Sequence, residues 1–267
     1  MSSAAWALRI QGLRKTFSVG WWGPPVVALD GLDLAVAPGE VIGLLGPNGA
    51  GKSTTFRLLA GLIRPTAGEA WVFDRPIGDP EARRAMGYVP DQPALYDYLT
   101  AEESLMLSGQ LTGVPPWRLR ERVEELLGVV GLQDVRHRRV RTFSKGMLQR
   151  VGMAQALVHE PACVLLDEPM SGLDPIGRAD MQALLWDLKR RGTTMLVSSH
   201  LLHDIAGLCD RVGVVVRGRL VVIGSVQDVF GTLGQCREAG LGVTGMPDTT
   251  MDVVFARYVR KHEECAR

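Results

Sequence analysis

One glycine-rich segment constrains the fold of this chain more than any other feature, and it reads Gly46-Pro47-Asn48-Gly49-Ala50-Gly51-Lys52-Ser53. It lies between an apolar run at 41–45, typical of a buried strand, and a helical pattern over 51–62. Glycines let the backbone approach phosphate oxygens closely, and the N-terminus of the following helix adds partial positive charge. The pattern therefore predicts a nucleotide site in which Lys52 reaches the outer phosphates, Ser53 offers its hydroxyl to Mg²⁺, and Thr54 completes the binding set.

The bulk composition indicates a globular protein without spanning segments. Of the 267 residues, 46% are apolar and 22% charged, and 30 basic residues nearly balance 29 acidic ones, so we expect no nucleic-acid partner. The apolar runs are of strand length, well below the roughly 20 residues that cross a bilayer, and no secretory signal opens the chain. With four widely spaced cysteines, read here as reduced thiols, the chain is expected to stay in the cytosol.

The order of sequence patterns predicts an α/β fold. The first forty residues contain short β segments at 8–12, 26–29 and 32–36, which indicate an N-terminal antiparallel β subdomain. Helical spacing dominates from about 88 to 160, and strands and helices alternate again from 163 to 223. We therefore expect a three-layer phosphate-loop NTPase core with a mainly parallel sheet, interrupted by a helical subdomain. This domain covers 1–230, and 231–267 forms a short C-terminal extension.

A second chemical pattern is the strand-like run Val164–Leu166, which ends in Asp167 and Glu168. In a nucleotide site, a carboxylate at the end of a strand holds Mg²⁺, and a neighbouring carboxylate can orient or deprotonate the attacking water. An acidic turn after a strand is common in proteins of many kinds. The phosphate loop upstream gives this one its functional interpretation.

Three further motifs make the chain resemble the ATP-binding-cassette (ABC) family over nearly the whole length up to about residue 230. Phe143-Ser144-Lys145-Gly146-Met147 stands where the family has its signature motif, Ser171-Gly172-Leu173-Asp174 matches the loop after the acidic pair, and His200 matches the switch histidine. The resemblance implies head-to-tail pairing of two such domains, as a homodimer or a heterodimer. Ser144 and the N–H of Gly146 would then bind the γ-phosphate of an ATP held by the partner subunit.

The resemblance also suggests roles for single residues. Glu168 is the candidate base for the attacking water, and His200 would contact the γ-phosphate and polarise the water or sense its loss. The family stacks adenine on an aromatic residue near the N-terminus, for which Phe17 is the best match; Trp21 and Trp22 are alternatives.

The chain departs from the family pattern in two places. Lys145 and Met147 replace the third and fifth residues of the usual signature, a form similar to the exporter branch whose ATPase and membrane subunits are separate chains. Asp91 stands where the family usually has glutamine, with Gln92 next to it. A carboxylate oxygen at 91 can still bind Mg²⁺ or the attacking water, and Gln92 is the alternative.

The expected function is that of an ATP-hydrolysing subunit of a transporter. Segment 93–100 is relevant to the contact with the membrane subunit. In the family this segment lies where the membrane subunit docks, which makes Tyr96, Tyr98 and Leu99 candidates for coupling; packing inside the helical insert is the alternative. The basic run Arg136–Arg139 is read as a solvated loop or as a contact with the membrane surface or a partner phosphate. We expect the chain to bind a transmembrane permease and to lie on the cytoplasmic face of the cell membrane. The alternative function is a soluble cassette ATPase acting on nucleic acid or ribosomes.

Overall fold

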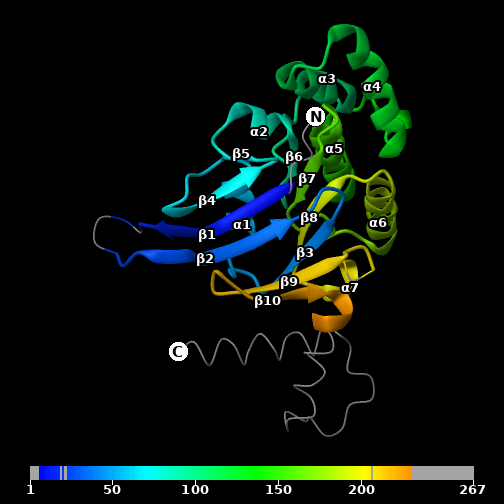
Figure 1. Cartoon of the computed structure of the whole chain (residues 1–267). Coiled ribbons are helices and arrows are strands. Elements are labelled where there is room, and N and C mark those ends of the chain that lie inside the picture. Colours follow the sequence, from blue (N-terminus) through cyan, green and yellow to red (C-terminus); the bar gives the residue numbers. More distant parts are fainter. Residues whose placement is uncertain (1–5, 19, 21–22, 206, 230–267) are drawn as a thin grey trace, which may run out of the picture.

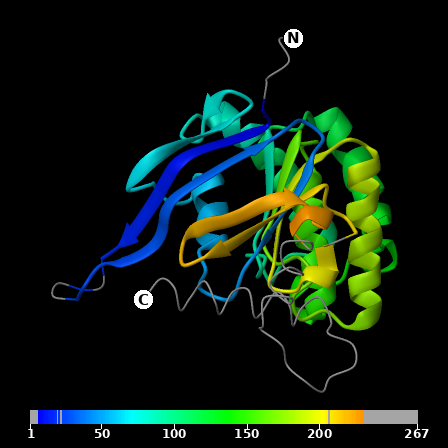
Figure 2. The ribbon, with the colours of Figure 1, turned by 60° about the horizontal axis from the view of Figure 1, so that its bottom comes forward.

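Two β-sheets and a group of helices make up the part of the chain that the computed structural model describes, residues 6–18, 20, 23–205 and 207–229 (Figure 1). The expected C-terminal extension at 231–267 lies outside the described residues, as do Trp21 and Trp22. Figure 2 shows the long strands of one sheet on one side of the molecule and helices packed on the other.

The central sheet has six strands in the order β10-β9-β3-β8-β7-β6, and all neighbouring pairs are parallel except β9 with β10. Its strands are β3 (Val41–Leu45), β6 (Met86–Val89), β7 (Cys163–Leu166), β8 (Thr194–Ser199), β9 (Arg211–Val216) and β10 (Arg219–Ser225). The expectation of a mainly parallel sheet is thus confirmed. Because the strands are parallel, the segments that follow β3, β8, β7 and β6 meet at one edge of the sheet.

The N-terminal sheet is antiparallel, as expected, with the order β2-β1-β4-β5. Its strands are β1 (Leu8–Phe17), β2 (Val26–Val36), β4 (Ala67–Val72) and β5 (Arg75–Pro76). The two segments predicted at 26–29 and 32–36 form the single strand β2, because Gly31 adopts φ +79° and the pairing with β1 continues past it. The sequence patterns did not indicate β4 and β5, whose residues are largely exposed.

The helices are α1 (Lys52–Leu59), α2 (Pro80–Arg84), α3 (Ala101–Thr112), α4 (Pro116–Val129), α5 (Lys145–Leu157), α6 (Pro175–Arg190) and α7 (Leu202–Ile205), with 3₁₀ turns at Gln133–Val135 and Val140–Thr142. Thr100 and Glu103 form a capping box at the start of α3. The expected helical insert begins near 88, yet Tyr88 and Val89 belong to β6, and its first helix starts at Ala101. In Figure 1 α3 and α4 stand at one end of the molecule, and α5 runs back toward the central sheet.

Two apolar cores cover the two faces of the central sheet. Along β3 the side chains alternate, so that Val41 and Leu45 join the core with α5 and α6, whereas Ile42 and Leu44 join the core with α1 and the N-terminal sheet. Burial on both faces explains why β3 and β7 are uninterrupted apolar runs in the sequence. Within the described residues, no helix has the length and apolar character needed to cross a membrane.

Candidate active site

The phosphate loop follows β3 and is shaped by backbone contacts that only glycine allows. Gly51 has φ +109°, and a Cβ there would lie 2.6 Å from the carbonyl oxygen of Ala28. A Cβ on Gly46 would lie 2.4 Å from the carbonyl oxygen of Val215. The loop is therefore closely backed by β2 and β9 before α1 begins at Lys52.

Lys52 is 5% exposed and turns back onto the loop. Its Nζ donates hydrogen bonds to the carbonyl oxygens of Gly46 at 2.6 Å and Pro47 at 3.2 Å. The same Nζ lies 3.2 Å from Oε1 of Glu168. A buried cation is therefore held where the sequence pattern predicts that phosphates bind, with acceptors that an anionic ligand could replace.

Asp167 follows β7 and is almost fully buried, with 2% exposure. Its Oδ1 accepts a hydrogen bond of 2.7 Å from the hydroxyl of Ser198 in β8. Burial raises the pKa of Asp167 above its ordinary value of 3.8, and hydrogen bonds with Ser198 and Ser53 oppose this shift only in part. Asp167 and Ser53, two predicted metal ligands, are thus brought into contact.

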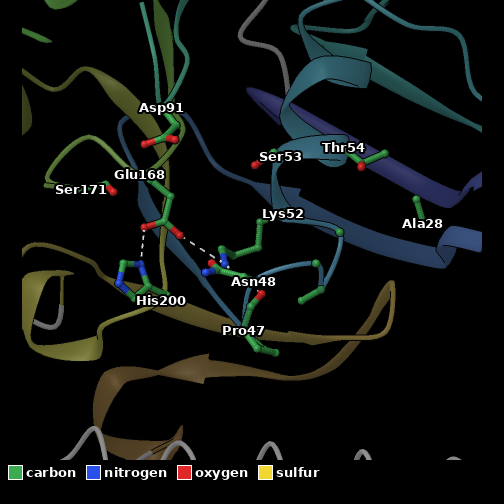
Figure 3. A pocket seen from close by; sticks show the side chains of 13 residues that line it. Ala28, Pro47, Asn48, Lys52, Ser53, Thr54, Asp91, Glu168, Ser171 and His200 are labelled. Carbon is green, nitrogen blue, oxygen red and sulfur yellow. Dashed lines mark hydrogen bonds and ion pairs between the residues drawn. The ribbon is translucent and has the colours of Figure 1, made fainter.

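Glu168 adopts φ +51°, a left-handed conformation that is uncommon for a residue with a side chain. Its N–H donates a hydrogen bond of 2.8 Å to the Ser198 hydroxyl. Its carboxylate bridges two groups, because Oε1 faces Lys52 and Oε2 lies 2.7 Å from Nδ1 of His200 (Figure 3). The turn of the backbone therefore aims this carboxylate into the site.

Lys52, Glu168 and His200 line a pocket of about 400 Å³ in front of the phosphate loop (Figure 3). Its walls are Ala28, Pro47, Asn48, Gly49, Ala50, Gly51, Lys52, Ser53, Thr54, Asp91, Glu168, Ser171 and His200. Most predicted site residues are thus brought together. They arrive from the segments after β3, β6, β7 and β8, the neighbouring strand ends at one edge of the sheet.

Two wall residues, Ala28 and Ser171, had no site role in the sequence analysis. Ser171 belongs to a tetrapeptide that carries the family resemblance, so that motif could have identified it. Ala28 has no side-chain chemistry that marks it. Only the placement of β2 beside the loop reveals it.

Oxygen donors for a hard cation are present at the edge of the pocket. Within the described residues, Oδ1 of Asp91 is buried and has no hydrogen-bond partner. No group of three or more histidine, cysteine, aspartate or glutamate side chains in the same part of the chain could hold a metal alone. A hydroxyl with one or two carboxylates fits Mg²⁺, which usually keeps several waters and shares substrate phosphates.

Five predicted residues are not among the walls of this pocket: Gly46 and Asp167, which lie next to wall residues in the chain, and Ser144, Gly146 and Phe17, which come from other parts of the fold. Ser144 is the exposed N-cap of α5, where its hydroxyl accepts a hydrogen bond of 3.3 Å from the N–H of Met147, and Gly146 lies in the first turn. Phe17 ends β1, is 39% exposed and lies 5.0 Å below the ammonium group of Lys15. The contact of Phe17 with adenine stays a prediction.

Comparison with known proteins places this architecture in a family. Residues 29–171 match the family model described as ABC transporter. An uncharacterized ABC transporter ATP-binding protein of Nostoc sp. is 45% identical over 82% of this chain and 67% of its own length. The daunorubicin/doxorubicin resistance ATP-binding protein DrrA of Streptomyces peucetius is 42% identical over 78% of this chain and 63% of its own length. The chain thus spans about two thirds of the length of these relatives.

Among solved structures, the dimeric post-hydrolysis state of the ATP-binding cassette MJ0796 bound to ADP and Pi is similar, with a TM-score of 0.75 and 26% identity. The match covers 82% of this chain and 98% of that one. It includes the combination of an antiparallel N-terminal sheet, a mainly parallel six-stranded sheet and a helical insert. From this match, the family model and the relatives, we conclude that the chain belongs to the ABC transporter family, as an ATP-binding ATPase subunit.

Proposed function

We propose that this chain is the motor subunit of an export transporter, and that it hydrolyses ATP as a head-to-tail dimer on the cytoplasmic face of a membrane permease. The observation that carries the proposal is the connected set Lys52–Glu168–His200 in front of the phosphate loop. The names of relatives support export, since one of them is a daunorubicin/doxorubicin resistance protein.

The proposed reaction begins with the release of Glu168 from Lys52. The β- and γ-phosphates of ATP compete for the Lys52 ammonium group, which then leaves the Glu168 carboxylate free. Water attacks the γ-phosphorus, its proton passes to Glu168, and the bond to the leaving ADP oxygen breaks to yield ADP and phosphate. His200, hydrogen-bonded to Glu168, orients this carboxylate and contacts the γ-phosphate.

Ser53, Asp167 and Asp91 are proposed to hold Mg²⁺ together with the phosphates. The buried Oδ1 of Asp91, without a partner in the described part of the chain, supports its inclusion, and so does the contact between Ser53 and Asp167. The ion would neutralise charge on the phosphate oxygens. It would also offset the desolvation that raises the pKa of Asp167 in its absence.

A second copy, or a related subunit, is proposed to complete the site through its Ser144 and Gly146. The exposed start of α5 supports this, because a capped helix N-terminus presents N–H groups and partial positive charge to an anion. The dimeric cassette that this chain resembles supports pairing as well.

The permease is proposed to dock on Tyr96 and Tyr98. Both side chains are more than half exposed, at 55% and 57%, and their rings lie 5.7 Å apart, so neither is a core residue. Arg139 supports the segment by donating a hydrogen bond of 2.6 Å to the Tyr98 carbonyl oxygen. Arg136 is bound internally, to Glu102 and Glu124, and takes no part in this surface.

Isothermal titration of the full chain with Mg-ATP tests the nucleotide role. Wild-type protein should bind, and Lys52→Ala should bind at least about tenfold more weakly because the phosphates lose their buried cation. Arg84→Ala is the control, since Arg84 forms an exposed ion pair with Glu81 outside the pocket. Equal binding by wild type and Lys52→Ala would remove the phosphate role.

Co-purification tests the docking proposal separately. Alanine at Tyr96 and Tyr98 should reduce recovery of the chain with its membrane subunit, while Mg-ATP binding by the isolated chain stays unchanged. Normal recovery of the complex would leave the two tyrosines without a coupling role.

A further inference from the structure

The turn between β9 and β10, Arg217–Gly218, touches both the phosphate loop and the N-terminal sheet. The N–H of Gly218 donates a hydrogen bond of 2.8 Å to the carbonyl oxygen of Ala50, inside the phosphate loop. The carbonyl oxygen of Gly218 accepts one of 2.9 Å from the N–H of Asp30, in β2. One buried residue thus joins the two walls of the nucleotide pocket.

The fit around this glycine leaves no room for a side chain. Gly218 has φ +77°, and a Cβ there would lie 2.7 Å from the carbonyl oxygen of Ala28 and 2.8 Å from the Cα of Leu29. Both atoms are backbone, and ordinary van der Waals contact begins only at 3.4 Å, so β2 or the turn would have to move. Ala28 lines the pocket, which means that this movement would reach the nucleotide.

A second contact holds the turn against β2. The guanidinium group of Arg219 donates a hydrogen bond of 2.9 Å from Nε to Oδ2 of Asp30, and this interaction lowers the pKa of the Asp30 carboxyl. Since Arg219 is 68% exposed, the pair contributes little to global stability. Because the pair lies at the turn, it connects β10 of the central sheet to β2 of the N-terminal sheet locally.

The phosphate loop leans on the same structure from the other side. A Cβ built on Gly51 would lie 3.3 Å from the Cα of Gly218. The backbone of Val215 in β9 packs against Gly46. The β9–β10 hairpin therefore supports the loop at both of its ends. None of these contacts involves the groups assigned to chemistry.

We infer that Gly218 is a positioning residue for nucleotide binding, which sets the distance between the phosphate loop and the β2 wall without touching the nucleotide itself. The inference rests on the proposed function, because it assumes that ATP occupies the pocket between those walls. It predicts that a disturbance of the turn weakens ATP binding and leaves the chemical step intact.

Gly218→Ala in the full chain tests the inference, with Gly192→Ala as the matched control. Gly192 has nearly the same φ, +75°, but a Cβ there would meet no atom within 4 Å, and it lies before β8, at the opposite end of the strands. Both variants carry the same backbone strain. Only Gly218→Ala adds the clash with β2.

Titration with Mg-ATP and steady-state hydrolysis supply the readouts. We expect Gly218→Ala to raise the Kd and the KM at least about tenfold, because misplacement of a binding element by about 1 Å can cost up to about 10²-fold. Its kcat should stay within about threefold of wild type, and Gly192→Ala should match wild type in both constants. Equal Kd values for the two variants, or a loss confined to kcat, would overturn the inference.

If Gly218→Ala does not fold, Arg219→Ala provides the test. Arg84→Ala is its control, because Arg84 is about as exposed as Arg219, at 70% and 68%, and its ion pair with Glu81 lies outside the pocket. We expect a KM about threefold higher for Arg219→Ala alone, a small effect because the ion pair that is lost is exposed. Identical KM values for these two variants would overturn the inference. Wild-type protein that binds no Mg-ATP would instead remove the proposed function, and the inference with it.

Discussion

Replacement of Glu168 by glutamine separates the roles that the structure gives to this side chain. The carboxylate lies 3.2 Å from the Lys52 ammonium group and 2.7 Å from Nδ1 of His200, at 12% exposure. Glutamine keeps the size of the side chain and one acceptor oxygen, but it removes the negative charge and the ability to accept a proton. Hydrolysis, nucleotide binding and stability should therefore change by different amounts and in different directions.

The expected loss in turnover is about 10²- to 10⁴-fold, the usual contribution of a positioned general base, which corresponds to roughly 3–5 kcal/mol of activation free energy. Nucleotide-free protein should lose about 1 kcal/mol of stability, because a charge-assisted contact with Lys52 becomes a neutral one. In wild-type protein, the Lys52–Glu168 contact must be broken before Lys52 can bind the phosphates, and in Glu168→Gln this cost falls by the same amount. Mg-ATP should therefore bind about fivefold more tightly.

Three measurements on the purified full chain check these values: the hydrolysis rate, the Kd for Mg-ATP by calorimetry, and the Tm with and without nucleotide. The Tm of nucleotide-free Glu168→Gln should fall by about 2–4 °C. Glu160→Gln is the control, because Glu160 is 51% exposed and pairs with Arg118 outside the pocket. Turnover within about tenfold of wild type, or weaker binding of Mg-ATP, would refute the reasoning.

Three other substitutions test neighbouring groups. His200→Ala should lower turnover by about 10- to 100-fold through loss of its contact with Glu168, with little change in the Kd for Mg-ATP; a rate within about twofold of wild type would leave His200 without this role. Asp167→Asn should raise the Tm of nucleotide-free protein at about pH 7. Burial raises the pKa of Asp167 in the folded state, so the wild-type protein loses stability as the pH rises through that pKa and the buried carboxyl becomes charged. Asparagine stays neutral and avoids this loss. The advantage of this variant should vanish below the unfolded-state value of 3.8, and a Tm difference independent of pH would contradict the assignment. Gln149→Met should raise the free energy of unfolding in urea by about 1–2 kcal/mol, because the Gln149 amide is 98% buried and has no hydrogen-bond partner among the described residues, whereas lower stability would show that the amide is paired.

Much of the fold could be predicted from short-range patterns. The run Val41–Leu45 is apolar throughout because both faces of β3 are covered, and such a strand is recognisable without knowledge of its neighbours. The helices α3, α4 and α5 lie within the region of helical spacing predicted at about 88–160, because caps and apolar spacing are local signals. The strands β4 and β5 were missed, since the conformation of their exposed residues depends on the pairing of β4 with β1 and of β5 with β4.

The sequence by itself determined which groups are available for chemistry: a phosphate loop at a strand end, an acidic pair at another, and a histidine after a third. These follow from local backbone requirements, such as the positive φ of Gly51, that leave a direct mark on residue type. Only the tertiary structure decided that Lys52, Glu168 and His200 form one connected set, because their contacts depend on the strand order β3-β8-β7. The contacts of Gly218 with the phosphate loop and β2 are also visible only in the tertiary structure, because a glycine in a turn does not reveal in the sequence which distant backbone it touches.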